Sequence, residues 1–210
     1  MNERTPTVFV VDDDSAVRKA VARLLRSAGI EVVVFGSPVE FLAAHDPQAL
    51  GCLLLDVEMP ELNGLDLQRA LSGRGATLPI IFLSGHADIP ISVRAMKAGA
   101  TDFLTKPVRD EELLASVRAA IEKDRTDRAV RADAEDIAAR LRMLTPREHE
   151  VLEHVIAGKL NKQIASDLGT VEQTIKAHRA RMMEKMNVNS VAELVRLVER
   201  ARATMYTKVQ

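Results

Sequence analysis

Two groups of aspartates in the first half of the chain follow directly after apolar runs. Val8–Val11 ends in Asp12, Asp13 and Asp14, and Cys52–Leu55 ends in Asp56. In an open parallel sheet, the carboxyl ends of the strands meet at one edge. If these two strands are neighbours, three or four carboxylates converge without an obvious counter-charge. Such a cluster is stable with a bound cation, or where one carboxylate does chemistry.

A hydroxyl and an ammonium group follow two further apolar runs. Ser84 comes after Pro79–Leu83, and Lys106 comes just after Thr101–Leu104. Acids that hold a hard cation, one acid as nucleophile, a hydroxyl and an ammonium together suit phosphoryl transfer to a carboxylate, with Lys106 and Ser84 holding phosphoryl oxygens. Magnesium fits best because it binds through one or two carboxylates and keeps water ligands. We therefore predict that Asp56 is a phosphate acceptor.

Alternating strands and helices are needed to bring these residues to one edge. The apolar pattern predicts strands over residues 7–11, 31–35, 52–56, 79–83 and 101–104. A helix follows each strand, the first from Asp14 or Ser15 to Gly29 and the others over about 38–44, 65–71, 90–98 and 109–123. Five strands alternating with five helices in roughly 120 residues predict a doubly wound α/β domain.

The second half of the chain is basic and helical. Residues 1–139 hold 16 basic and 22 acidic residues (net −6), whereas residues 140–210 hold 13 and 8 (net +5), so nucleic acid is a candidate partner of the second half. Helices are predicted from Pro146 to Gly158 and over about 161–168, 171–186 and 190–202, which describes a helix-turn-helix module. Residues 122–142 lack Pro and Gly, and are either an extension of the preceding helix or a second exposed helix.

The third helix of this module has an inward stripe and a surface suited to nucleic acid. The inward stripe consists of Val171, Ile175, His178, Met182 and Met186. The remaining surface carries small and basic residues, namely Lys176, Ala177, Arg179, Ala180 and Arg181. Small residues let a helix approach the bases, and cations meet phosphates or guanine edges.

The first half resembles the receiver domain of two-component response regulators. The resemblance is carried by Asp12-Asp13, Asp56 with Met59-Pro60 and Gly64, Ser84-Gly85-His86 and Lys106-Pro107, while Gly85–Pro90 and Ala95–Ala100 resemble the FixJ subgroup. It implies a flavodoxin-like sheet of order 2-1-3-4-5 and a cis Lys106-Pro107 peptide. It implies that Asp56 accepts a phosphoryl group from the phosphohistidine of a partner sensor kinase. It further implies that Mg²⁺ is held by Asp12, Asp13, Asp56 and the backbone carbonyl of Glu58, and that Ser84, Lys106 and Phe103 bind the phosphoryl group or switch with it.

Residues 143–202 resemble the LuxR/FixJ-type DNA-binding domain. The matching segments are Leu144–Glu148, Gly158 with Asn161-Lys162, and Thr174–His178. The resemblance places the third helix in the major groove and implies DNA contacts by Thr174, Lys176, Ala177, Arg179, Ala180 and Arg181. Thr170-Val171-Glu172 departs from the family's Ile followed by a Ser cap, so Thr170 with Gln173 is the expected substitute cap.

These observations predict a transcriptional response regulator and not an enzyme. The expected domains are a receiver over residues 1–122, a helical linker over 123–142 and a helix-turn-helix domain over 143–210. The expected partners are a sensor histidine kinase, double-stranded DNA, a second copy of the chain upon phosphorylation and, as a further candidate, RNA polymerase. A lone Cys52 and the absence of an apolar run of about 20 residues predict a cytoplasmic protein with no membrane partner.

Two alternatives remain at this point. Asp12-x-Asp14 also suits an Asp-nucleophile phosphatase, in which Asp12 would be the nucleophile and Asp56 a metal ligand. The chain could instead bind DNA independently of phosphorylation, with a degenerate receiver. The basic half argues against the first alternative, and the intact set of Asp13, Asp56, Ser84 and Lys106 argues against the second.

Overall fold

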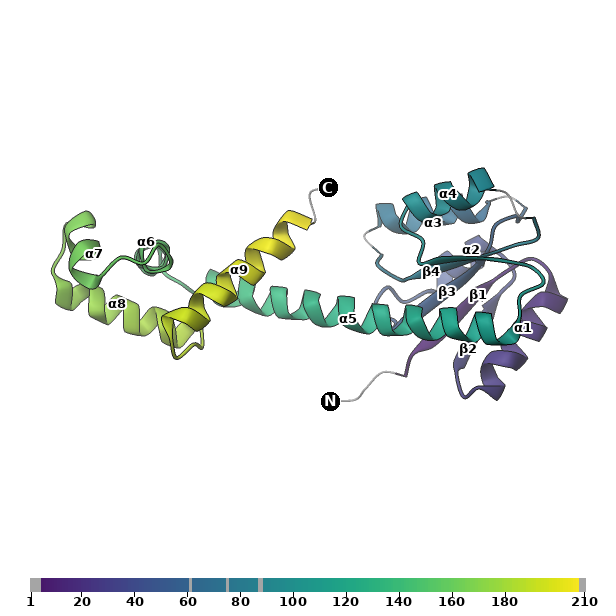
Figure 1. Cartoon of the computed structure of the whole chain (residues 1–210), viewed down its shortest axis with the longest axis horizontal. Coiled ribbons are helices and arrows are strands. Elements are labelled where there is room, and N and C mark those ends of the chain that lie inside the picture. Colours follow the sequence, from purple (N-terminus) through teal and green to yellow (C-terminus); the bar gives the residue numbers. More distant parts are fainter. Residues whose placement is uncertain (1–4, 61, 75, 87–88, 208–210) are drawn as a thin grey trace. The chain divides into compact units, whose positions relative to one another are not determined.

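The structure is a computed structural model of the 210-residue chain (Figure 1). It describes residues 5–60, 62–74, 76–86 and 89–207, without the side chains of residues 202–207, so Ala87 and Asp88 of the Gly85–Pro90 segment lie outside the described residues. The chain divides into two compact units, residues 1–127 and 128–210. Among the described helices, none is both long and apolar enough to cross a membrane.

The N-terminal unit is built on a parallel sheet whose order is β2-β1-β3-β4-β5, as the sequence predicts. The strands are β1 (Thr7–Val11), β2 (Glu31–Phe35), β3 (Gly51–Asp56), β4 (Ile80–Ser84) and β5 (Asp102–Thr105). The helices that follow them are α1 (Ser15–Ser27), α2 (Pro38–Ala44), α3 (Gly64–Gly73), α4 (Ile89–Lys97) and α5 (Asp110–Arg142). The doubly wound α/β prediction is confirmed.

Helices cover both faces of this sheet. On one face, Phe9 and Leu55 pack with Phe41 of α2, Leu67 of α3 and Ala95 of α4. On the other face, alternate strand residues such as Val10 and Leu54 pack with Leu25 of α1 and Val117 of α5. Because β3 and β4 are buried along their whole length, they can project polar groups only at their carboxyl ends.

The C-terminal unit is a helical domain with one apolar core. Its helices are α6 (Pro146–Ile156), α7 (Asn161–Asp167), α8 (Glu172–Lys185) and α9 (Val191–Thr207), preceded by the last part of α5. Leu152, Ile164, Ile175 and Leu194 come from the four helices and pack together with Ile137 of α5. Since α5 runs without a break from Asp110 to Arg142, residues 123–142 extend the preceding helix and are not a second helix.

The start of α8 differs from the sequence prediction. Val171 is the N-cap residue with an extended backbone, and its side chain is 65% exposed, so it does not belong to the inward stripe. No side chain caps this end of the helix, so the expected cap by Thr170 with Gln173 is wrong. The physical reason is that an N-cap residue lies outside the helical repeat, so counting helical positions back to Val171 fails.

Candidate functional site

The carboxyl ends of β1, β3 and β4 bring the candidate residues of the N-terminal unit together. Asp12 follows β1, Asp56 ends β3 and Ser84 ends β4, and these three strands are adjacent in the sheet. The Nζ of Lys106, which follows β5, lies 2.6 Å from Oδ2 of Asp12 and 2.9 Å from Oδ1 of Asp56. The Lys106-Pro107 peptide is cis, as the receiver resemblance implies.

Three carboxylates form a candidate cation site beside Lys106. One carboxylate oxygen from each of Asp12, Asp13 and Asp56 lies within 4.8 Å of the others. Asp12 is 1% exposed and Asp56 5% exposed, whereas Asp13 faces solvent. A single ammonium group cannot balance three carboxylates, and buried anions need a counter-charge. The donor set therefore fits a hard divalent cation that coordinates oxygen.

The electrostatics at Asp56 reflect burial and the adjacent lysine. Burial raises the pKa of Asp56, while the hydrogen bond from Lys106 lowers it by less, so its pKa lies above the ordinary value. Burial by itself would lower the pKa of Lys106, but its hydrogen bonds to Asp12 and Asp56 raise the pKa overall. Lys106 is thus held as an ammonium group, and Asp56 is a more basic carboxylate than an exposed aspartate, which favours a nucleophile.

The candidate switch residues lie at the ends of β4 and β5. The Ser84 hydroxyl donates to the backbone carbonyl of His86 at 2.8 Å and accepts from the N–H of the same residue at 3.2 Å. The half-buried Phe103 packs against the core with its ring centroid 6.2 Å from that of Phe82. The Glu58 carboxylate is exposed and lies 3.6 Å from Nδ1 of His86.

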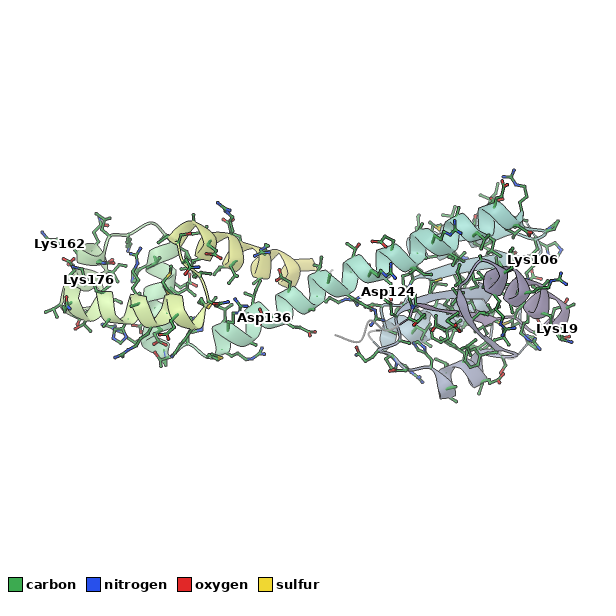
Figure 2. The ribbon with its side chains drawn as sticks, turned by 90° about the horizontal axis from the view of Figure 1, so that it is seen from below. Lys19, Lys106, Asp124, Asp136, Lys162 and Lys176 are labelled. Atoms are coloured by element: carbon green, nitrogen blue, oxygen red, sulfur yellow. The ribbon has the colours of Figure 1, made fainter. Side chains whose placement is uncertain are left out.

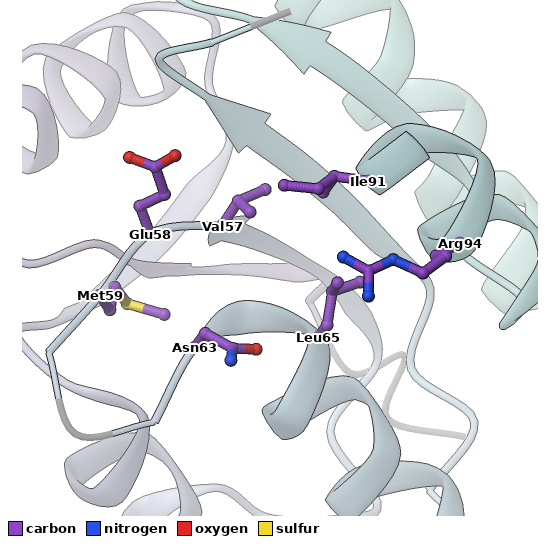
Figure 3. A pocket seen from close by; sticks show the side chains of 7 residues that line it. All are labelled: Val57, Glu58, Met59, Asn63, Leu65, Ile91 and Arg94. Carbon is purple, nitrogen blue, oxygen red and sulfur yellow. The ribbon is translucent and has the colours of Figure 1, made fainter. Parts of the chain in front are cut away.

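A groove of about 440 Å³ is lined by the residues that directly follow Asp56 in the chain (Figure 3). Its lining comes from the segment after β3, from the start of α3 and from α4, and consists of Val57, Glu58, Met59, Asn63, Leu65, Ile91 and Arg94. Figure 3 shows the Arg94 guanidinium directed from α4 toward Leu65 across the groove. Val57, the residue next to Asp56 in the chain, therefore lines the same groove as Ile91 and Arg94 of α4.

Gly64 is the residue that allows α3 to begin against the end of β3. A β-carbon at this position would lie 2.3 Å from the backbone oxygen of Asp56 and 3.0 Å from the Phe82 ring. We expect Gly64→Ala to lower the free energy of unfolding by about 1–3 kcal/mol, because the backbone beside Asp56 must shift. Labelling of Asp56 by acetyl phosphate should slow in parallel. Urea unfolding and labelling rates measure the two effects.

Gly73→Ala is the matched control for this prediction. Gly73 ends the same helix, and a β-carbon there meets nothing within 4 Å. This control should be neutral or slightly stabilising, because it only reduces the freedom of the unfolded chain. Equal effects of the two substitutions would refute the steric role assigned to Gly64.

The candidate DNA-binding residues of the C-terminal unit lie along α8. Ile175, Met182 and Met186 are fully buried, whereas the side chains predicted to meet DNA are exposed or half-buried. The exposed ones are Lys176, Ala177, Ala180 and Arg181, and the half-buried ones are Thr174 and Arg179. Figure 2 shows Lys176 on α8 and Lys162 on α7 projecting from the surface of this unit. The helix therefore presents the expected small and basic surface.

Two of these cations already have partners within the unit. Lys176 Nζ lies 3.1 Å from the Glu172 carboxylate one turn earlier in α8. Arg179 donates to the side-chain oxygen of Asn161 at the start of α7, at 3.0 Å. The Arg179 side chain therefore links α8 to α7, and Lys176 is held next to an acidic group.

The carboxyl end of α8 is fixed by a buried carboxylate that the sequence did not identify. Glu148 is 2% exposed, and its Oε2 accepts from Lys185 Nζ at 2.6 Å and from the Thr145 N–H at 2.8 Å. The Arg140 guanidinium also donates to the carbonyl of Met186 at 3.0 Å. The hydrogen bond from Lys185, followed by that from Thr145, lowers the pKa of Glu148 to about 2. The Thr145-x-x-Glu148 spacing is that of a capping box, which the structure contains, but no local pattern points to Lys185.

Comparison with known proteins matches both units to described families. The description "Response regulator receiver domain" matches residues 8–118, and "Bacterial regulatory proteins, luxR family" matches residues 142–198. The chain is 45% identical over 205 residues to the response regulator protein TodT of Pseudomonas putida, which covers 98% of this chain and 90% of TodT. It is 43% identical over 194 residues to the transcriptional regulatory protein FixJ of Bradyrhizobium diazoefficiens, covering 92% and 95%. The solved structure of the response regulator StyR matches with a TM-score of 0.86 at 45% identity, covering 93% of this chain and 99% of StyR.

Proposed function

The chain belongs to the two-component response regulators that join a receiver domain to a LuxR-type DNA-binding domain, and on this premise we propose that phosphorylation of Asp56 controls its binding to DNA. One observation carries the proposal. The nearly buried Asp56 carboxylate accepts a hydrogen bond from Lys106 and lies within 4.8 Å of the carboxylate oxygens of Asp12 and Asp13. This arrangement combines a nucleophile, a cation for the phosphoryl oxygens and ligands for a metal.

Asp56 acts as the nucleophile in the proposed phosphotransfer. A carboxylate oxygen attacks the phosphorus of a phosphohistidine on the partner sensor kinase, a P–O bond forms, the P–N bond breaks, and the imidazole leaves with the electron pair and takes up a proton. Lys106 stabilises the phosphoryl oxygens by its fixed positive charge, because its pKa is raised. Asp56 is buried at the end of β3, and this burial limits the access of water to the phosphorylated side chain.

Asp12, Asp13 and Asp56 would hold Mg²⁺ together with the backbone carbonyl of Glu58. The bound ion would neutralise part of the negative charge of the carboxylates and of the incoming phosphoryl group. The Asp12 carboxylate is held in a fixed orientation. Its Oδ2 accepts from Lys106 Nζ, and its Oδ1 accepts from the Asp14 N–H at 2.8 Å. The Asp14 carboxylate caps α1 by accepting from the Ala16 N–H. That role for Asp14 speaks against the Asp12-x-Asp14 phosphatase alternative.

A change at Ser84 and Phe103 would carry the signal from Asp56 to α4 and β5. The Ser84 hydroxyl is bound to the backbone of His86, so moving it onto a phosphoryl group would release this loop. Phe103 is only half-buried, so an inward turn of its ring would change the surface at β5. The exposed apolar side chains of α4, Ile89, Val93 and Met96, then suit an interface between two receivers. A receiver dimer brings two copies of α8 to paired half-sites on double-stranded DNA.

Phosphorylation by acetyl phosphate tests the role of the metal. Removal of Mg²⁺ by a chelator should lower the rate of labelling of the wild-type chain roughly 100-fold or more. Asp13→Asn should raise the Mg²⁺ concentration needed for half-maximal labelling about 10-fold or more, because an amide is a weaker ligand for a hard cation. Labelling is followed by intact-protein mass.

Asp110→Asn is the matched control for the metal experiment. Asp110 is an exposed carboxylate in the first turn of α5. Its replacement should leave the Mg²⁺ dependence unchanged. If Asp13→Asn and Asp110→Asn both labelled with wild-type Mg²⁺ dependence, Asp13 would not be a metal ligand.

The function as a whole is tested by DNA binding before and after phosphorylation. The full chain is incubated with a pool of random double-stranded DNA at fixed salt, with and without acetyl phosphate and Mg²⁺. We expect sequence-specific enrichment that increases on phosphorylation and occurs together with dimer formation in sedimentation. Equal enrichment in both states would support a phosphorylation-independent DNA binder in its place.

A further inference from the structure

The exposed face of α8 carries a glutamine, Gln173, together with two alanines. Gln173, Ala177 and Ala180 lie at spacings of four and three residues, which places them on one side of the helix. All three are exposed, and the opposite side carries the buried Ile175 and Met182. Of these three residues, only Gln173 has a long side chain. The two alanines leave space for a close approach to DNA.

The side-chain amide of Gln173 is available for a ligand. The sequence suggested that Gln173 would help cap α8, but Val171 is the N-cap residue and no side chain caps this end. Within the described parts of the chain, no residue forms a hydrogen bond with the Gln173 amide, whereas its neighbour Glu172 is paired with Lys176. An exposed amide without an internal role can use both its donor and its acceptor on a partner.

The position of Gln173 in α8 also matters. It is the second residue of the helix, which begins at Glu172. In helix-turn-helix proteins, the N-terminal residues of the recognition helix contact the edges of the bases. A glutamine amide pairs in bidentate fashion with N6 and N7 of adenine in the major groove, because it offers one acceptor and one donor in a plane.

We propose that Gln173 reads an adenine in each half-site and is a specificity-determining residue of this protein. The proposal rests on the proposed function, since it requires that α8 enters the major groove. It differs from the contact that we expect of the exposed Arg181, whose charge meets a phosphate. Gln173 carries no charge, so its contribution is selectivity at one base pair and not general affinity.

The test begins with the sequences that the phosphorylated full-length wild type enriches from random double-stranded DNA. Each base pair of the enriched site is then replaced in turn, and affinities are measured at several salt concentrations. For the wild type we expect one A·T pair per half-site that is preferred over the other three by about 5- to 150-fold. Gln173→Ala should abolish this preference, with the other positions and the salt dependence unchanged.

A second variant and a control make the outcome specific. Gln173→Arg should move the preference at the same position to G·C, because a guanidinium pairs with O6 and N7 of guanine. Arg181→Ala should instead weaken binding to all sequences alike and reduce the slope of log affinity against log salt by about one. Both substituted side chains are exposed, so the variants should fold as the wild type does.

Two results overturn the inference in distinguishable ways. If the wild type enriches a site and Gln173→Ala keeps the same preference at every base pair, or weakens binding to all sequences equally, Gln173 does not read a base, and the proposed function stands. If the phosphorylated wild type enriches no sequence at all, the proposed function fails and the inference fails with it.

Discussion

Asp56→Asn is expected to abolish phosphorylation of the chain and the dependence of DNA binding on acetyl phosphate. Asparagine has the shape of aspartate, and its side-chain oxygen can still accept the hydrogen bond from Lys106. It has no anionic oxygen to attack phosphorus, so the labelling rate should fall by at least roughly 10³-fold. Intact mass after incubation with acetyl phosphate and Mg²⁺ measures labelling, and DNA affinity at fixed salt measures the response.

Asp14→Asn is the control for this experiment, and it also tests the phosphatase alternative. Asp14 is exposed next to the carboxylate cluster and caps α1, and asparagine caps a helix about as well as aspartate. We therefore expect wild-type labelling from this variant. A loss of labelling in Asp14→Asn together with retention in Asp56→Asn would reverse the roles that we assign to the two residues.

Glu148→Ala is expected to destabilise the C-terminal unit by about 3 kcal/mol, because it removes one partner of a mostly buried ion pair and the cap of α6. Lys185 would lose its carboxylate partner, and the Thr145 N–H would lose its acceptor. Hydrogen exchange of the full chain, followed in peptides from α6 and α8, measures the free energy of opening of this unit. The N-terminal unit serves as an internal reference.

Glu150→Ala is the matched control in the same helix. Glu150 is exposed and pairs with Arg147 on the surface, so its removal should cost less than about 1 kcal/mol. Glu148→Gln keeps the volume of the side chain and removes only its charge, so its effect should lie between the two. Equal protection in Glu148→Ala and Glu150→Ala would show that the buried pair does not hold α8 in place.

The same carboxylate predicts the acid sensitivity of the C-terminal unit. The folded pKa of Glu148 is about 2, below its ordinary value of 4.5. A carboxylate with a lowered folded pKa stabilises the fold fully above its unfolded pKa, and this contribution is lost as the pH falls through the folded pKa. Protonation of Glu148 should therefore remove up to about 3 kcal/mol of the stability of the C-terminal unit between pH 4.5 and pH 2. In Glu148→Gln, the free energy of unfolding should fall by correspondingly less over the same pH range. Urea unfolding followed by circular dichroism measures this difference.

Most of the fold, and the placement of the candidate site residues at the strand ends, could be predicted because their signals are local. Apolar runs ending in Asp12, Asp56 and Ser84 define both the strands and the groups at their ends. Strand order then follows from the family resemblance and is confirmed by the sheet. Helix ends with a Gly or a capping side chain were also predictable, since Asp14 and Thr145 act on backbone groups within three residues.

The features that were missed depend on contacts between elements or on the state of one backbone position. Lys185 is 37 residues away from Glu148, and their pairing depends on how α6 packs on α8. The composition of residues 123–142 does not show whether they continue α5 or form a separate helix. A continued helix and a separate helix would have the same local pattern of residues. The start of α8 differs from the prediction because a single extended residue, Val171, takes the chain out of the helical repeat.

The sequence by itself determined which residues could do chemistry, on which strand ends they lie, and that an acidic receiver is joined to a basic helix-turn-helix domain. Only the tertiary structure decided that Lys106 lies against both Asp12 and Asp56, although it is 94 residues away from the first. The tertiary structure also decided that Glu148 is buried against Lys185 and that Gln173 is exposed with its amide available. The physical reason is that periodicity and capping act over one or two helical turns, whereas the partner of a polar side chain depends on the packing of elements distant in the chain.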